Sequence, residues 1–172
     1  MRKIFLFPVL ILVFMFYLCG SVYANTADSN VEEDRVISEI GVLVNQGKYK
    51  VALEKTEDSI SKYPESAFLY YWKATILSSL GDKKAAVENF NKSIELNPEN
   101  VGSYVLRGIC KYALNDYDGA LADYNKAIEL DPHNISAYNM RAGLKLQIGD
   151  LDGAVKDFDY IDSLKPEVQK SN

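Results

Sequence analysis

Residues 101–134 read VGSYVLRGICKYALNDYDGALADYNKAIELDPHN, and this pattern recurs along the chain with a period of 34 residues. Three kinds of residue keep the period: a proline, an alanine, and a glycine or asparagine. They are Pro64, Pro98, Pro132 and Pro166; Ala52, Ala86, Ala120 and Ala154; and Gly47, Gly81, Asn115 and Gly149. Because the period holds without insertion from residue 33 to residue 166, one structural unit is expected to repeat four times.

Each repeat carries the residues of a tight helical hairpin. Two antiparallel helices approach closely only where side chains are small, and Gly108 and Ala120 would supply such a contact in the third repeat. Tyr124, four residues after the alanine, lies one turn along the same helical face. Pro132 lacks a backbone donor and would end the second helix. A single hairpin cannot bury its apolar face, so a stack of hairpins is predicted.

These residues and their spacing resemble the tetratricopeptide repeat (TPR). The third repeat matches best, with Tyr104, Gly108, Ala120, Tyr124 and Pro132, and the first repeat is the weakest. The resemblance implies an all-α fold, a right-handed α-solenoid of four TPR hairpins. The expected repeats span residues 33–66, 67–100, 101–134 and 135–168, between a polar linker and helix cap at 25–32 and a tail at 169–172.

The first 24 residues predict export. A short basic start contains Arg2 and Lys3, an apolar run follows, and a cleavage site of the A-x-A type ends at Ala24. A signal peptide over residues 1–24 is the leading interpretation. An uncleaved anchor is one alternative, because the run approaches the ~20 residues that span a bilayer. Lipidation of Cys19 is another, although Leu18 stands where a small residue is usual. Each interpretation makes the repeats periplasmic or secreted, with membrane contact only through the N-terminus.

The charge balance disfavours nucleic acid as a partner. The chain has a formal net charge of −5, and cleavage after Ala24 would remove two basic residues and make it −7. Nucleic-acid binding needs clustered lysine and arginine. Cys110 would be the only cysteine of the cleaved chain, so no internal disulfide is expected, and it is predicted to be a small buried residue.

Residues that could carry chemistry are few. His133 is the only histidine and is expected in a solvated loop. The Gly-Asp and Asn-Asp pairs indicate hairpin turns and not a phosphate-binding loop. Asp157 and Asp159 are expected among the charges of the outer helices, not in a cleft. No catalytic activity, metal, cofactor or small-molecule substrate is therefore predicted.

The resemblance also implies a concave face, lined by the first helix of each repeat, that binds peptides or partner helices. Among its inward positions only Asp34 is charged, although 25% of the chain is charged. Relatives that clamp an acidic C-terminal tail use basic and amide residues at places held here by Ile37, Gly41, Trp72, Gly102 and Leu106. An amphipathic helix or extended apolar segment is the expected ligand. The predicted binding residues are Phe68, Tyr71, Trp72, Val105, Ile109, Tyr112, Asn139 and Met140.

Two alternatives stay open at this point. The aromatic residues of the predicted groove would instead complete the core between hairpins. The chain would also suit a structural subunit of an envelope or secretion complex, assembled through its ends, where Val155, Phe158 and Leu164 lack a following hairpin. Asp162 stands where earlier repeats have isoleucine and disfavours tight end-to-end stacking. The leading prediction is a non-catalytic adaptor or scaffold outside the cytoplasm that binds a protein or peptide.

Overall fold

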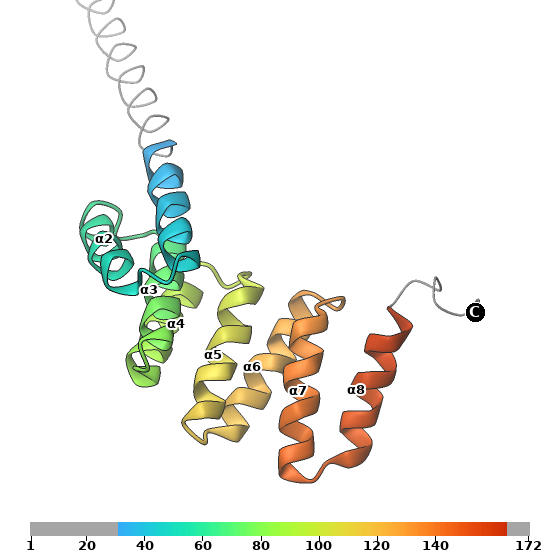
Figure 1. The fold of residues 1–172 in the computed structure, drawn as a ribbon. Helices are drawn as coiled ribbons and strands as arrows, with labels where there is room; N and C mark the ends of the chain where they lie inside the picture. The colour runs from blue at the N-terminus through green and yellow to red at the C-terminus, as the bar shows by residue number, and fades with distance from the viewer. Residues whose placement is uncertain (1–30, 165–172) are drawn as a thin grey trace, which may run out of the picture. The chain divides into compact units, whose positions relative to one another are not determined.

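The computed structural model describes residues 31–164, and all regular structure within that range is α-helical. A first helix covers residues 31–45. The helices that follow are α2 (Tyr49–Lys62), α3 (Ala67–Ser79), α4 (Lys83–Leu96), α5 (Val101–Ala113), α6 (Tyr117–Leu130), α7 (Ile135–Ile148) and α8 (Leu151–Ser163) (Figure 1). The all-α prediction is confirmed for these residues. The predicted signal peptide, the linker up to residue 30 and the tail lie outside them.

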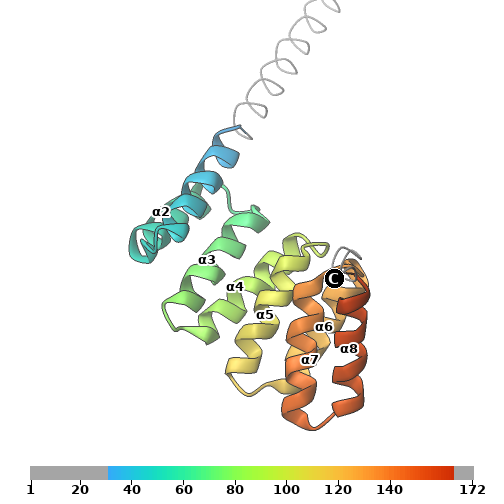
Figure 2. The ribbon, with the colours of Figure 1, turned by 45° about the vertical axis from the view of Figure 1, so that its right-hand side comes forward.

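The chain divides into two compact units, residues 1–39 and residues 40–172. The described part of the first unit, residues 31–39, is helical. In the second unit consecutive helices pack as hairpins, α3 with α4, α5 with α6, and α7 with α8 (Figures 1 and 2). Neighbouring hairpins meet because α4 contacts α5 and α6 contacts α7, while α5 also contacts α3 and α7. This nearest-neighbour packing is that of an α-solenoid.

None of the helices between residues 31 and 164 is both long enough and apolar enough to cross a bilayer.

Side-chain caps at fixed repeat positions start the helices. Asp116 accepts a hydrogen bond from the backbone N–H of Gly119 at 3.0 Å where α6 begins, and Asn134 accepts one from Ala137 at 3.0 Å where α7 begins. The other helices of the second unit with side-chain caps use Ser66, Asp82, Asn100 and Asp150. Asn115, before the aspartate cap of α6, has φ 63°, and glycine takes positive φ at the same place in the other hairpins. The Gly-Asp and Asn-Asp pairs are therefore hairpin turns, as predicted.

Small residues allow the helices of a hairpin to approach closely. Ala74 on α3 and Ala86 on α4 are fully buried and pack with Phe90 in one core cluster. In the next hairpin the small residue is Gly108, and a Cβ atom there would lie 2.5 Å from the ring of Tyr124. Only glycine at this position permits the observed placement of that ring.

A buried ion cluster joins α5 and α6, the hairpin of the third repeat (the third hairpin). Asp123 on α6 accepts hydrogen bonds at 2.9 and 2.6 Å from the guanidinium group of Arg107 on α5. The Nζ atom of Lys111 lies 2.9 Å from the same carboxylate. Two cations from one helix face a single carboxylate from the other. The cluster therefore fixes the position of the two helices relative to each other along their axes.

The fourth hairpin repeats this cluster with Asp157 on α8 and Arg141 and Lys145 on α7. The sequence-based expectation that Asp157 is a solvated charge of an outer helix is wrong, because only 3% of the residue is exposed. Asp159, two residues later, is exposed as expected. The strict spacing of 16 residues between the arginine and the aspartate in both hairpins was the sequence signal for this cluster.

Each of these arginines also reaches the preceding hairpin. The Nη1 atom of Arg107 donates to the side-chain oxygen of Asn91 on α4 at 2.8 Å, and Arg141 donates to Asn125 on α6 at 2.7 Å. The guanidinium group therefore binds an aspartate of its own hairpin and an asparagine of the previous one. Its planar fork of donors suits this double contact, which lysine could not reproduce.

We expect Asp157→Asn to lower the free energy of unfolding by about 3 kcal/mol at pH 7, because it leaves Arg141 and Lys145 without their buried anion. Burial opposes ionisation of Asp157, but hydrogen bonds from Arg141 and Lys145 outweigh it and lower the pKa of this carboxyl group. A lowered pKa in the folded state stabilises the fold above the ordinary aspartate value near ~3.9, and this stabilisation is lost as the pH falls further.

Urea denaturation of the purified chain between pH 2 and pH 7 measures both effects. Asp159→Asn, an exposed neighbour on the same helix, serves as the control and should change stability little. Equal stability of Asp157→Asn and the unaltered chain at pH 7 would contradict the structural role of the cluster.

Candidate functional site

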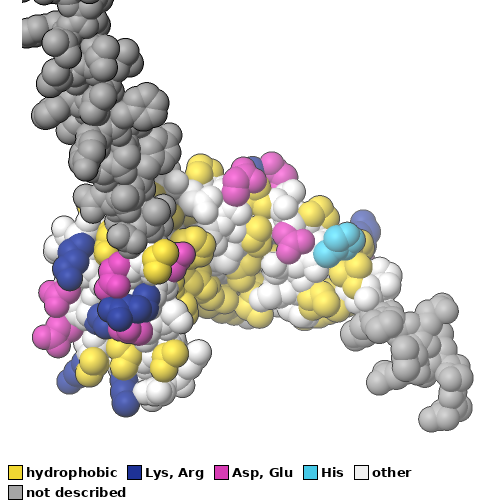
Figure 3. All heavy atoms as spheres, turned by 90° about the horizontal axis from the view of Figure 1, so that it is seen from above, with side chains coloured by type: hydrophobic (Ala, Val, Ile, Leu, Met, Phe, Trp, Pro, Cys, Tyr) yellow, Lys and Arg dark blue, Asp and Glu magenta, His cyan; other side chains and the backbone are white. Residues whose placement is uncertain are grey.

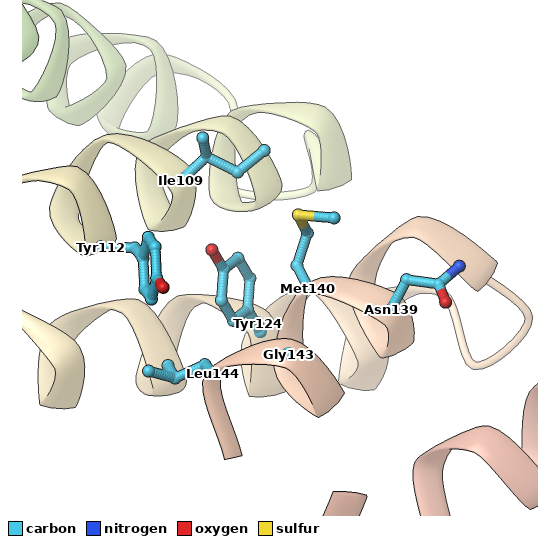
Figure 4. A pocket seen from close by; sticks show the side chains of 7 residues that line it. All are labelled: Ile109, Tyr112, Tyr124, Asn139, Met140, Gly143 and Leu144. Carbon is cyan, nitrogen blue, oxygen red and sulfur yellow. The ribbon is translucent and has the colours of Figure 1, made fainter. Parts of the chain in front are cut away.

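A pocket of about 340 Å³ opens between α5, α6 and α7 (Figure 4). This volume lies at the lower end of the ~300–1,000 Å³ range of ligand pockets. Its lining residues are Ile109 and Tyr112 from α5, Tyr124 from α6, and Asn139, Met140, Gly143 and Leu144 from α7. None of them is charged. Four residues of the predicted binding set meet here: Ile109, Tyr112, Asn139 and Met140.

The pocket exists because α7 has glycine at residue 143. A Cβ atom at Gly143 would meet no other atom within 4 Å. One repeat earlier the same position is Ile109, whose side chain packs against two core clusters. At Gly41, which holds this position in the first repeat, the ring of Trp72 closes the space 3.2 Å from where a Cβ would lie. The open space beside Gly143 is thus a property of the junction between α5 and α7.

Tyr124 on α6 lines the inner end of the pocket, and only 2% of this residue is exposed. Its ring lies against Gly108, and its hydroxyl group points into the pocket on the side of Tyr112 and Ile109 (Figure 4). Burial, reinforced by the nearby charge of Asp123, raises the pKa of the Tyr124 phenol above its ordinary value. The group therefore stays protonated and can donate a hydrogen bond at any physiological pH.

The predicted aromatic residues of α3 lie elsewhere and are partly structural. The Tyr71 ring makes edge contacts with Trp72 and Phe90, at centroid distances of 5.5 and 6.0 Å, and packs against the core cluster around Phe90. Phe68 is 52% exposed on the same helix. Tyr71 and Trp72 thus follow the alternative that places them between hairpins, whereas Phe68 is free to contact a partner.

Val105 does not line an accessible surface. It is only 6% exposed and packs in a core cluster with Tyr104, Ala127 and Ala137. Val105 packs against neighbouring helices and does not line the pocket, so it is not part of the candidate site. The pocket instead includes Tyr124, which sequence reasoning assigned to the core alone.

Two sequence signals pointed to the missed residues. Gly143 stands where the preceding repeat has isoleucine, so a missing side chain could have been read directly. Tyr124 stands where the second and fourth repeats have Phe90 and Phe158, which lack its hydroxyl group. Leu144 carries no such signal, because a leucine in a helix reads as an ordinary core residue.

The other residues considered for chemistry lie as their local sequence suggests. His133 is exposed in the loop between α6 and α7, and Figure 3 shows the histidine at the surface. Cys110 is buried, and its Sγ atom lies 3.4 Å from the hydroxyl oxygen of Ser78. Within residues 31–164 no three histidine, cysteine, aspartate or glutamate side chains are grouped so as to hold a metal ion.

Family models of the tetratricopeptide repeat match residues 69–100, 102–134 and 123–156. The first two of these ranges coincide with the hairpins α3–α4 and α5–α6, and the third runs from within α6 to within α8. The chain is therefore a tetratricopeptide-repeat protein. A comparison with curated protein sequences gives no significant match.

Several solved structures share this fold at low sequence identity. A crystal structure of MamA has a TM-score of 0.71 at 23% identity, covering 76% of this chain and 77% of that one. The first TPR domain of Spaghetti (RPAP3), bound to the HSP90 peptide SRMEEVD, has a TM-score of 0.65 at 23% identity over 68% and 93%. YrrB, described as a TPR protein with an unusual peptide-binding site, has a TM-score of 0.66 at 22% identity, covering 75% of this chain and 66% of that one. At these identities the likeness concerns the fold alone.

Two glycine substitutions should change stability in opposite directions. Gly108→Ala should lower the free energy of unfolding by about 1–3 kcal/mol, because the new methyl group collides with the Tyr124 ring. Gly143→Ala should raise it by about 0.5–1 kcal/mol, because alanine favours the helix and meets open space. Urea denaturation of the two variants beside the unaltered chain measures both. A destabilised Gly143→Ala variant would show that the pocket is closed in solution.

Proposed function

We propose that this TPR protein is a non-catalytic adaptor that holds an uncharged, apolar segment of a partner protein at the pocket between α5, α6 and α7. The observation that carries the proposal is the pocket itself, which is open and has no charged lining residue. Met140 and Tyr112 are exposed at its rim and offer further apolar contact. Exposed aromatic and methionine side chains are typical of binding hot spots.

The ligand proposed here differs from that of the RPAP3 domain. The peptide bound to that domain, SRMEEVD, carries three acidic residues. On this chain the pocket offers no cation, and Arg107 and Lys111 nearby on α5 are held by Asp123. An acidic peptide would therefore lose its hydration without gaining a counterion. The places that would form a carboxylate clamp hold residues such as Trp72 and Gly102.

The proposed place of action is outside the cytoplasm. Support comes from the sequence of residues 1–24, whose basic start, apolar run and small residue at position 24 fit an export signal. Mass spectrometry of the chain recovered from the extracytoplasmic fraction should find Asn25 as the first residue. A first peptide that begins at Met1 in the cytoplasmic fraction would contradict export.

The second candidate function is assembly through the last hairpin. The observation in its favour is a row of exposed apolar side chains on α8, formed by Leu151, Val155 and Phe158. Asp162 is exposed on the same helix and would have to be accommodated in such an interface. We rank this candidate second because none of these three side chains lines the pocket described above.

A displayed library of random 15-residue peptides tests the first candidate against the second. The baits are the full chain, Met140→Glu at the pocket rim, and Val155→Glu as a matched control on α8. Both positions are exposed, so both variants should fold, which circular dichroism checks. We expect the full chain and Val155→Glu to select the same apolar peptides, and Met140→Glu to select none of them.

SRMEEVD, used as a labelled probe in the same assay, should not bind the full chain. If Val155→Glu no longer selects the peptides while Met140→Glu still does, the binding surface lies on α8 and the second candidate is favoured. Identical selection by all three baits would remove the pocket as the functional site.

A further inference from the structure

We propose that the pocket recognises one peptide unit of its partner: an apolar side chain enters beside Gly143, and the Tyr124 hydroxyl group donates a hydrogen bond to a carbonyl oxygen of the same segment. This inference rests on the proposed function and specifies what the partner must present. It assigns Tyr124, a residue otherwise belonging to the repeat core, to ligand recognition.

The Tyr124 hydroxyl group is the candidate hydrogen-bond donor of the pocket. Every fully buried side-chain nitrogen or oxygen among the described residues has a hydrogen-bond partner. No hydrogen bond within residues 31–164 involves the Tyr124 hydroxyl group. This group is therefore the accessible end of a side chain that is otherwise enclosed, and the space it faces is the pocket (Figure 4). An acceptor brought by a ligand would supply the missing partner.

The acceptor that suits this donor is an uncharged carbonyl oxygen. The Tyr124 phenol is buried and keeps its proton, so it acts as a donor. A carboxylate is a poor acceptor here, because none of the seven lining residues is lysine or arginine. A carbonyl oxygen accepts the same hydrogen bond without carrying a charge into an apolar space. Asn139, exposed at the rim on α7, can pair with a neighbouring peptide group through its amide.

The ligand side chain beside this carbonyl is apolar. Ile109, Met140 and Leu144 present carbon and sulfur to the interior of the pocket. Gly143 leaves the space that an isoleucine fills one repeat earlier. An apolar side chain of about that size, β-branched like isoleucine or γ-branched like leucine, matches this space. Flexible methionine at the rim would adapt to either.

Among the four corresponding repeat positions, only Gly143 leaves an open space. One repeat before Gly143, the corresponding residue is Ile109, which packs into the core. Three repeats before Gly143, the corresponding residue is Gly41, which the Trp72 ring covers. At the position two repeats earlier, Thr75 donates a hydrogen bond to the backbone oxygen of Tyr71 at 2.8 Å. The partner is therefore positioned by one side chain at the junction of α5 and α7, and exposed aromatics such as Phe68 only extend the contact.

Fluorescence anisotropy with a labelled peptide from the library selection tests this inference. The full chain is compared with Gly143→Leu, which fills the pocket, and with Tyr124→Phe, which removes only the hydroxyl group. Gln147→Leu, an exposed change one turn further along α7, is the matched control. We expect Gly143→Leu to weaken binding at least about 30-fold, because the inserted side chain loses its site. Tyr124→Phe should weaken it about 3- to 10-fold, as expected for one hydrogen bond, and Gln147→Leu should leave it unchanged.

The outcomes separate the inference from the proposed function. Unchanged affinity in both Gly143→Leu and Tyr124→Phe, with binding still lost in Met140→Glu, would overturn the inference and leave a groove-binding adaptor. Unchanged affinity in Met140→Glu as well would overturn both. Circular dichroism and thermal melting check folding. If Gly143→Leu fails to fold, Tyr124→Phe still decides, because phenylalanine already occupies this repeat position at Phe90 and Phe158.

Discussion

The close contact between a small residue on one helix and a ring on the next is the constraint on which this structure depends. In the third hairpin it is formed by Gly108 and Tyr124, and no larger residue than glycine fits under that ring. The same contact uses Ala74 and Phe90 one repeat earlier. Glycine in place of alanine gives room for tyrosine in place of phenylalanine. The packing of the hairpin thereby brings a hydroxyl group into the pocket.

In each of the last two hairpins an ion cluster lies between the helices, and no charged side chain lines the pocket. Asp123 and Asp157 each neutralise an arginine and a lysine of the helix they face. The second hairpin has Asn89 at this position, and its side chain donates to the backbone oxygen of Ala85. The two hairpins that form the pocket are thus the two with ion clusters. We infer that this bonding holds α5 and α7 in place, so that the pocket exists before a partner binds.

The repeat period was enough to predict the fold, because each residue that keeps the period has one physical task. Pro98 and Pro132 follow the ends of α4 and α6 by two residues, as a residue without a backbone donor should. Cys110 is buried as predicted, and the small residues Ala74 and Ala86 share one core cluster. These features depend on local geometry and on the identity of single residues, which a sequence displays directly.

Only part of the site could be predicted. It depends on which face each helix turns toward its neighbours, and on the absence of a side chain at Gly143. Position within a repeat could not tell buried Val105 from Ile109, which lines the pocket, although both lie on α5. It also could not show that Tyr71 packs against its neighbours while Phe68 stays exposed. Asp157 was misplaced because its two cations come from another helix. In each case the deciding contact is made by residues distant in sequence.

The most direct test of the account is to observe a ligand inside the pocket. Met140 is the only methionine among residues 31–164, and its side chain lines the site, so its methyl group is a local probe. In the full chain with ¹³C-labelled methionine methyl groups, nuclear Overhauser effects should connect the Met140 methyl group to the apolar side chain of a bound peptide. A peptide that saturates the chain and leaves the Met140 signal unmoved, with no such effect, would contradict the account.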